Sequence, residues 1–161
     1  MNLEVNNIRR SYAIMTGVLI LLFIADRLTK YWAKDVLEGV ITPIPRVLEF
    51  DFVFNESFVM NVTLPLMLTI AIIVAVIVFM VAVAARELHN GHHAHVMLLA
   101  VILLGAFSNL IDRIRYGAVM DFISVPGLTV FNLADAYIVI AAVLLLLVMQ
   151  SEKKKLDTAP E

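Results

Sequence analysis

The segment 65–85, PLMLTIAIIVAVIVFMVAVAA, contains no charged residue, and it constrains the fold more than any other part of the chain. A helix needs about 20 mostly apolar residues to cross the ~30 Å hydrocarbon core of a bilayer. Because no water pairs with the backbone there, such a segment must form a helix that satisfies its own N–H and C=O groups. The chain is therefore predicted to cross a membrane, with Pro65 in the first turn, where its missing N–H costs nothing.

Three further segments have the length and apolar character of membrane spans. Together with 65–85 they are 11–33, 95–112 and 132–150. Hydrophobic residues make up 61% of the chain, above the roughly 45–50% of a soluble domain. The first segment runs into DRLTKYW without a small-x-small cleavage site, which indicates a retained anchor rather than a signal peptide. We expect one integral membrane domain over 1–161, an all-α membrane protein with four transmembrane helices.

The basic residues that flank the spans predict the orientation of the chain. Arg9 and Arg10 precede the first span, Arg86 follows the second, and 153–155 (KKK) follow the fourth. Four crossings place these three regions on one side, and basic flanks favour the cytoplasm. The N-terminus and the tail 151–161 are therefore predicted to be cytoplasmic. The loops 36–64 and 113–131 are then predicted to be extracytoplasmic.

The loop between the first two spans contains an alternating pattern, VLEFDFVFN. Phe50, Phe52 and Phe54 fall on one face of an extended chain. Glu49 and Asp51 fall on the other face. A period of two predicts a strand. We expect a small extracytoplasmic β-ribbon, or cradle, between helices 1 and 2, with its apolar face on the membrane surface or over a pocket.

Polar side chains gather at one depth, the outer ends of the predicted spans and the loop 113–131. They are Asp26 and Lys30, Asn109 and Arg113, Asp121, and Asn132 with Asp135. Ionisable groups at membrane depth are costly and usually face an internal cavity or a partner. Separate helix ends that all place polar groups at this depth therefore indicate a shared site.

Each of these pairs also has a purely structural interpretation. Asp26 and Lys30, spaced i,i+4, suit a neutralised pair on one helix face. Asn132 with Asp135 at i,i+3 suits an N-cap with a variant of the capping box. The Asp112-Arg113 step suits a stop at the water interface. None of these pairs alone establishes a site.

Two carboxylates held together in a poorly hydrated site have a specific chemical use. Both cannot ionise cheaply, so one pKa rises and the pair shares a proton. The ionised member then takes a proton from water while the protonated member polarises a carbonyl, as in aspartic proteases. The chain has no cysteine, which excludes thiolate nucleophiles and disulfides, and its histidines fall on the opposite side of the membrane.

Three motifs, DRLTKYW, GAFSNLIDRIRYGAVMDF and FNLADA, resemble those of the lipoprotein signal peptidases (signal peptidase II). They occur in this order on four spans, so the resemblance covers nearly the whole chain. It implies a bacterial membrane aspartic peptidase that removes signal peptides before a diacylglyceryl-modified cysteine. Asp112 also matches the second motif, and we expect it to tether Arg113 or Arg115 rather than to catalyse.

The resemblance assigns the catalytic roles to Asp121 and Asp135. Supporting or substrate-binding roles fall to Asn109, Arg113, Asn132, Asn55, Asp26 and Lys30. The family motif N-x-G-A-A-F is matched only at its asparagine, because the chain reads NESFVM there. Asn55 and Asn61 are both candidates for that asparagine. The bulkier Ser57, Phe58 and Val59 indicate a reshaped substrate pocket.

The implied activity needs no metal and no cofactor. The implied partners are a prolipoprotein carrying a diacylglyceryl cysteine and the lipids of the bacterial cell membrane. We expect a monomer whose active site faces the extracytoplasmic side. Two alternatives remain: a small ion-coupled transporter with an Asp26–Asp121–Asp135 relay, and a non-catalytic relative that binds lipoprotein precursors.

Two other sequence features carry less weight. The net charge is −2, which gives no electrostatic basis for nucleic-acid binding. The stretch HNGHHAH, with His89, His92, His93 and His95, is similar to a metal-binding tract. Because it falls in a cytoplasmic turn with few carboxylates, we interpret it as a solvated hinge.

Overall fold

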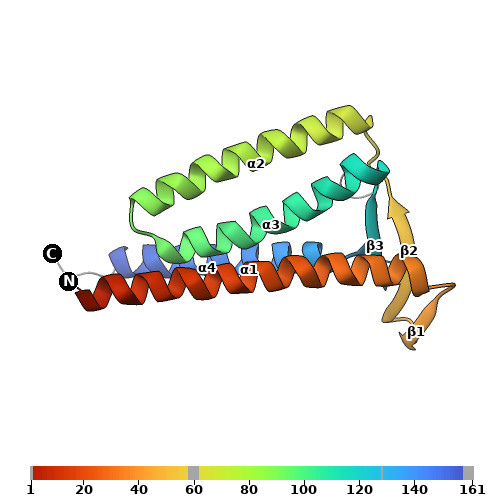
Figure 1. Cartoon of the computed structure of the whole chain (residues 1–161), viewed down its shortest axis with the longest axis horizontal. Helices are drawn as coiled ribbons and strands as arrows, with labels where there is room; N and C mark the ends of the chain where they lie inside the picture. Colours follow the sequence, from red (N-terminus) through yellow and green to blue (C-terminus); the bar gives the residue numbers. More distant parts are fainter. Residues whose placement is uncertain (1, 58–61, 128, 158–161) are drawn as a thin grey trace.

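The computed structural model describes residues 2–57, 62–127 and 129–157. Four long helices lie along one direction, and a small sheet lies across one end of them (Figure 1). The helices are α1 (Asn2–Val36), α2 (Leu66–His89), α3 (His93–Tyr116) and α4 (Leu133–Asp157). Each is long and apolar enough to cross a membrane. The predicted class, a membrane protein with four apolar helices and a small β element, is confirmed.

The helices extend beyond the apolar segments. α1 begins at Asn2 rather than near residue 11, and α4 runs on to Asp157 rather than stopping near 150. Polar residues outside a hydrocarbon core can continue a helix, because water pairs with any backbone group that the helix leaves open. Hydrophobicity therefore locates the apolar part of each helix but not its ends.

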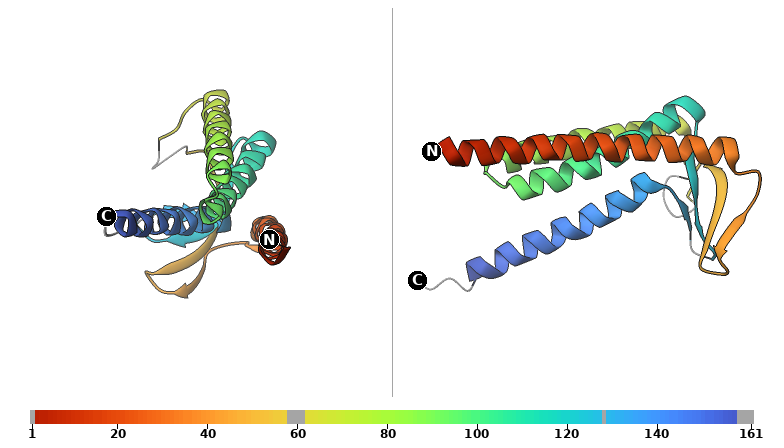
Figure 2. Two further views of the ribbon diagram at one scale, coloured as in Figure 1. Left: turned by 90° about the vertical axis from the view of Figure 1, so that its left-hand side faces the viewer. Right: turned by 60° about the horizontal axis from the view of Figure 1, so that its bottom comes forward.

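α3 is the central helix, because it packs against α1, α2 and α4. Figure 2 shows that α4 diverges from α1 with distance from the sheet. The contact between α3 and α4 is close at Gly105, where an added Cβ would lie 2.6 Å from a side-chain carbon of Ile138. Glycine at this position lets the two helices approach near the level of the polar residues.

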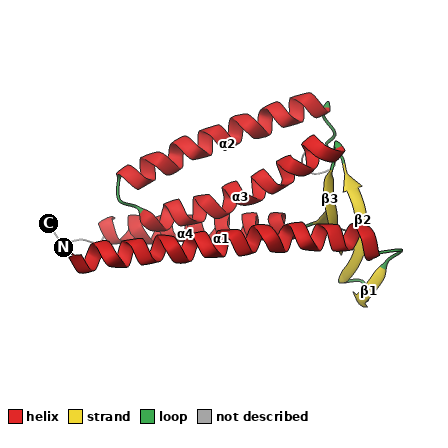
Figure 3. Cartoon of the chain, viewed as in Figure 1, coloured by secondary structure: helices red, strands yellow, loops and turns green. Residues whose placement is uncertain are grey.

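The sheet has four antiparallel strands in the order β1-β2-β3-β4. Figure 3 shows β1, β2 and β3 at one end of the helices. They are β1 (Ile41–Ile44), β2 (Leu48–Asn55), β3 (Val119–Val125) and β4 (Thr129–Phe131). The strand predicted from the period-two pattern is present as β2. The segment between α3 and α4, expected only as a loop, supplies β3 and β4. The β element is thus built from both loops, not only from the one between α1 and α2.

β3 carries Asp121 into the interior. Its residues from Val119 to Phe122 are buried, and Asp121 is opposite Val53 of β2. Gly117 ends α3 in the left-handed conformation, with φ 76°, and its N–H bonds to Arg113 O at 2.9 Å. This glycine cap turns the chain from α3 directly into β3. Asp121 therefore lies five residues beyond Tyr116, the end of the central helix.

The turn between α2 and α3 lies at the end of the helices away from the sheet (Figure 1). The interpretation of its histidines as a solvated hinge is wrong for His95, whose side chain is buried. His95 lies in the first turn of α3 and contacts carboxylates of α2 and α4. Packing of three helix ends, which a local pattern does not reveal, buries it.

Candidate active site

A buried ionic cluster joins α1 to α3 behind the candidate site. Asp26, Lys30 and Asp112 are fully buried, and Arg27 is largely covered. The predicted pairing of Lys30 with Asp26 is confirmed, at 3.1 Å between Nζ and Oδ2. Two cations face two anions, so no buried charge is left uncompensated.

The expectation that Asp112 tethers Arg113 or Arg115 is wrong. Asp112 pairs instead with Arg27 at 2.6 Å and with Lys30 at 2.8 Å, both on α1. Asp112 and Arg113 are adjacent on the helix, so their side chains point in different directions. Arg115 donates instead to the Tyr31 hydroxyl at 2.9 Å. Asp112 faces α1, and its partners come from a segment more than 80 residues earlier.

Asp26 also ties α1 to the other two helices of the site. Its Oδ2 accepts a hydrogen bond from Ser108 Oγ at 2.5 Å, and its Oδ1 accepts one from the backbone N–H of Ala134 at 2.9 Å. The sequence interpretation did not include Ser108. The sequence feature that could have identified Ser108 is its position four residues before Asp112, which places both side chains on one face of α3.

The start of α4 is a reciprocal cap. The N–H of Asp135 donates to Asn132 Oδ1 at 3.0 Å, and the N–H of Asn132 donates to Asp135 Oδ2 at 3.2 Å. The structural interpretation of this pair as a capping box is therefore confirmed. Asn132 also contacts one of the candidate catalytic carboxylates, because its Nδ2 donates to Asp121 Oδ1 at 2.6 Å.

Asn109 is held in one orientation by its neighbours. Its Oδ1 accepts from Lys30 Nζ at 2.8 Å and from Asn132 Nδ2 at 3.2 Å. Its Nδ2 must therefore face the other way, and it donates to Asp135 Oδ1 at 2.8 Å. Lys30 does not line the cavity itself, but it sets the direction of the amide that does.

Asn55 orients the second carboxylate from the end of β2. Its Nδ2 donates to Asp121 Oδ2 at 2.7 Å, while its Oδ1 accepts from the N–H of Ser57 at 2.9 Å. Arg113 Nη2 holds the Ser57 carbonyl at 3.2 Å. This places Asn55 at the site. The alternative candidate Asn61, and Phe58 and Val59, lie outside the described residues.

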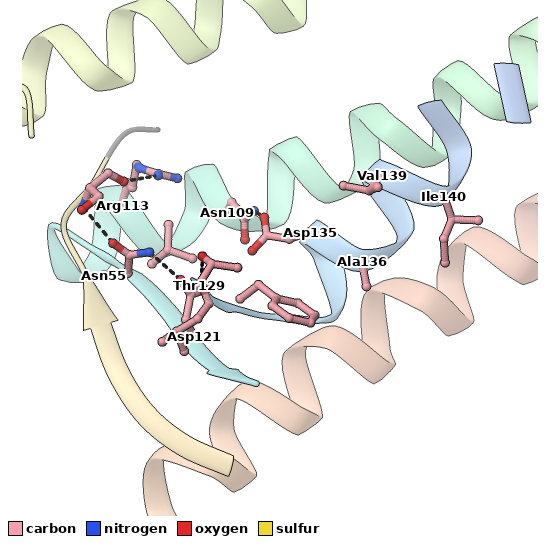
Figure 4. A pocket seen from close by; sticks show the side chains of 13 residues that line it. Asn55, Asn109, Arg113, Asp121, Thr129, Asp135, Ala136, Val139 and Ile140 are labelled. Atoms are coloured by element: carbon pink, nitrogen blue, oxygen red, sulfur yellow. Dashed lines mark hydrogen bonds between the residues drawn. The ribbon is translucent and has the colours of Figure 1, made fainter. Parts of the chain in front are cut away.

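Asp121 and Asp135 line one cavity of about 650 Å³. Figure 4 shows Asp121 on its strand side and Asp135 on its helix side, with Asn55, Asn109 and Arg113 beside them. Apart from Ser57 and Thr129, the remaining lining is apolar, from Val119, Val130, Phe131, Ala136, Val139 and Ile140. Asp26 and Lys30 lie outside this lining, in the buried cluster behind it.

A second cavity of about 250 Å³ meets the same polar residues from the side of α2. Asn109, Arg113 and Asp135 border both cavities. The rest of the second lining is apolar, from Ile72, Ile73, Val76 and Ala106. Asn109, Arg113 and Asp135 therefore lie at the boundary between the two apolar-walled cavities.

Burial raises the pKa of Asp121 from 3.8 to about 6. The hydrogen bond from Asn55 opposes this rise, the negative charge of Asp135 adds to it, and the bond from Asn132 opposes it. The negative charge of Asp135 therefore favours the protonated form of Asp121. A pKa near 6 lets the pair hold a proton close to neutral pH.

Two carboxylates that line one apolar-walled cavity and accept hydrogen bonds from amides are compatible with the chemistry of an aspartic peptidase. Comparison with known families agrees and is more specific. The family model described as "Signal peptidase (SPase) II" matches residues 18–151, and the chain belongs to this family.

Individual relatives support the same assignment. The lipoprotein signal peptidase of Geobacter sulfurreducens is 30% identical, over 90% of this chain and 96% of its own length. That of Caldanaerobacter subterraneus subsp. tengcongensis is 34% identical, over 74% of this chain and 84% of its own. A solved bacterial membrane enzyme, at 18% identity, has the same fold with a TM-score of 0.73 over 92% of this chain and 94% of that one. The chain is thus a multi-pass bacterial membrane aspartic peptidase of the signal peptidase II type.

Proposed function

We propose that this protein cleaves signal peptides from diacylglyceryl-modified prolipoproteins, with Asp121 and Asp135 activating a water molecule. One observation carries the proposal: both carboxylates line the same cavity, and amide donors orient each of them. The name shared by the relatives, lipoprotein signal peptidase, supplies the substrate class.

The reaction follows from one shared proton. The ionised carboxylate removes a proton from water, and the water oxygen bonds to the scissile carbonyl carbon. The protonated carboxyl gives its proton to the carbonyl oxygen, which yields a neutral tetrahedral intermediate. Collapse of this intermediate breaks the C–N bond: the proton taken from water passes to the leaving amine, and a hydroxyl proton of the intermediate returns to the other carboxylate, which leaves the carboxylic acid product and restores the shared proton. Neither a metal nor a cofactor is needed.

The two cavities suit the two parts of this substrate. The larger, apolar-walled cavity is wide enough for the extended backbone around the scissile bond, which we place between the sheet and α4. The smaller one lies between α2 and α3 and suits an apolar lipid chain. Arg113 borders both and carries a positive charge. We assign it, with Asn55, to binding polar groups of the substrate.

We place the N- and C-termini in the cytoplasm and the site at the extracytoplasmic face of the bacterial cell membrane. The basic flanks of the helices support this orientation. The cradle of β1 to β4 then lies on the outer surface, over the end at which a lipid-anchored substrate arrives. We propose that a monomer is sufficient, because one chain supplies both carboxylates and all of the orienting amides.

The direct test uses a prolipoprotein carrying diacylglyceryl cysteine and follows release of its signal peptide. Asp121→Asn and Asp135→Asn should each lower the cleavage rate by about 10³-fold or more, because either change removes one half of the proton relay. Asp35→Asn, at the exposed end of α1, is the matched control and should keep the wild-type rate.

Two results would contradict this proposal. Either variant cleaving at the wild-type rate would rule out the carboxylate pair. Wild-type protein that binds the substrate without cleaving it would instead show a non-catalytic relative. Tryptophan fluorescence and gel filtration in detergent would confirm that the variants are folded.

A further inference from the structure

Three side chains converge at the turn between α2 and α3, at the end of the molecule away from Asp121. Nδ1 of His92 lies 2.8 Å from Oε2 of Glu87, and Nδ1 of His95 lies 2.7 Å from the same oxygen. One possible ligand atom from each residue lies within 4.8 Å of the others. The two imidazole rings are 5.0 Å apart between centroids.

His95 lies between two carboxylates in a buried position. Its side chain is 7% exposed, and its Nε2 lies 3.2 Å from Oε2 of Glu152 on α4. That nitrogen is buried and lacks the alignment of a hydrogen bond. A neutral imidazole has a single N–H, so it cannot donate to Glu87 and Glu152 together. A cation held at Nδ1 would remove this conflict, because the single N–H could then stand at Nε2 and face Glu152.

We propose that Glu87, His92 and His95 form a binding site for a divalent transition metal ion such as Zn²⁺. Two imidazole nitrogens and one carboxylate oxygen are a ligand set that Zn²⁺ accepts. With metal–ligand bonds of about 2.0–2.1 Å, tetrahedral ligand atoms lie about 3.3 Å apart. The observed separations of 2.7 and 2.8 Å must therefore widen by roughly half an ångström. His92, in the turn, has room for this movement because its side chain is 45% exposed.

Glu152 has a defined place in this site. A metal-bound histidine usually donates its other ring N–H to a carboxylate, which fixes the tautomer and makes the ligand more basic. With Nδ1 of His95 on the metal, Nε2 carries the proton and faces Glu152. The buried nitrogen then gains the partner that it lacks. The site joins the end of α2 and the start of α3 and, through Glu152, ties both to the end of α4.

The ligand atoms come from a sequence pattern that spans the end of one helix and the start of the next. Glu87 is in the last turn of α2, His92 is the N-cap of α3, and His95 is in its first turn. The tight turn at Gly91, with φ 78°, brings these positions together. The site is far from the carboxylate pair along the helices, so it does not depend on the proposed peptidase mechanism.

The test is a titration of the full-length protein, in detergent, with Zn²⁺ as the probe. The protein should carry no histidine tag and should first be stripped with a chelator. We expect one saturable Zn²⁺ per chain by calorimetry, and a higher unfolding temperature with the metal because it binds only the folded form. Glu87→Gln and His95→Ala should remove this binding. His89→Ala, an exposed neighbour outside the cluster, should bind as the wild type does.

Glu152→Gln tests the tie to α4 and should weaken Zn²⁺ binding by about 10–100-fold. Gel filtration would show that each variant is folded. Glu87→Gln keeps the shape of the side chain, so it tests the ligand atom without the change in packing that His95→Ala causes. Absence of saturable binding at micromolar Zn²⁺ would overturn the proposal, as would equal binding by wild type and Glu87→Gln. Either result would leave the contacts of the two histidines with Glu87 as packing of the helix ends.

Discussion

Three asparagine side chains determine how the two carboxylates of the candidate site are oriented. In Asn55, Asn109 and Asn132, Oδ1 accepts a hydrogen bond from an N–H or ammonium donor, and Nδ2 donates to a carboxylate. Reversing any of these amides would set an oxygen against a carboxylate oxygen. The direction of each amide is therefore enforced by its neighbours rather than by the carboxylates alone.

The pH dependence of cleavage should respond to Asn55. Its hydrogen bond favours the ionised form of Asp121 and so lowers a pKa that burial has raised to about 6. In Asn55→Ala this bond is lost and the pKa of Asp121 rises further. Asp121 and Asp135 should then keep their shared proton to a higher pH. The alkaline limb of the plot of kcat against pH should therefore shift to higher pH. Glu56→Ala, an exposed neighbour, is the control. An alkaline limb at the same or a lower pH would contradict the role of Asn55 in stabilising the ionised form of Asp121.

Lys30 should be required for stability as well as for amide orientation. It is fully buried between Asp26 and Asp112, at 3.1 and 2.8 Å. Lys30→Met leaves two buried carboxylates facing one arginine, which should cost about 3–5 kcal/mol of unfolding free energy. The double variant Lys30→Met/Asp26→Asn restores the charge balance and should recover part of this loss. Thermal unfolding in detergent would measure both, and a double variant no more stable than the single one would refute this explanation.

Residue-level prediction from the sequence succeeded where partners are local and failed where they are distant. The Asp26–Lys30 pair and the Asn132–Asp135 cap depend on helix spacing alone, and both are present. The partners of Asp112 come from α1, and its adjacent arginines misled the interpretation. Only the packing of α1 against α3 reveals that contact.

At the scale of the elements, the contact between α3 and α4 positions one of the carboxylates. Gly105 lies where a Cβ would meet Ile138 at 2.6 Å and Tyr137 at 2.8 Å. These residues directly follow the first turn of α4, which holds Asp135. A Cβ at position 105 would therefore force these side chains, or α4 with them, to shift.

Gly105→Ala should therefore lower the unfolding free energy by about 1–3 kcal/mol through overpacking. It should also slow cleavage, since a shift of α4 moves Asp135 away from Asn109. Gly17→Ala is the matched control, because nothing lies within 4 Å of a Cβ there, and alanine is a better helix former. Unfolding temperature and cleavage rate should be measured together. Equal behaviour of the two variants would show that the close approach at Gly105 has no effect.

The strands were only partly predictable from the sequence. β2 alternates between apolar and polar residues, and this pattern indicates a strand. β3 is buried along most of its length and has no such alternation. β1 contains Pro43, which argues against a central strand, and β1 is indeed at the edge of the sheet. Asp121 was therefore expected in a loop, whereas the pairing of β2 with β3 fixes its position.

At the scale of the whole molecule, the candidate active site lies at one end of the helices, and Glu87, His92 and His95 lie at the other. The absence of native cysteine makes their sidedness testable with single introduced cysteines. In intact cells, a membrane-impermeant maleimide should label Glu38→Cys, beside the sheet. It should label Asn90→Cys, in the α2–α3 turn, only after permeabilisation. The reversed labelling pattern would invert the proposed orientation.

The sheet that closes one end of the molecule draws its strands from two loops separated by a pair of helices. β2 is synthesised well before β3, and α4 emerges last. While the chain is still being synthesised, at most one of the two carboxylates, Asp121, can have reached its final position. Under the proposed mechanism, hydrolysis begins only after the start of α4 has brought Asp135 to the cavity that Asp121 lines.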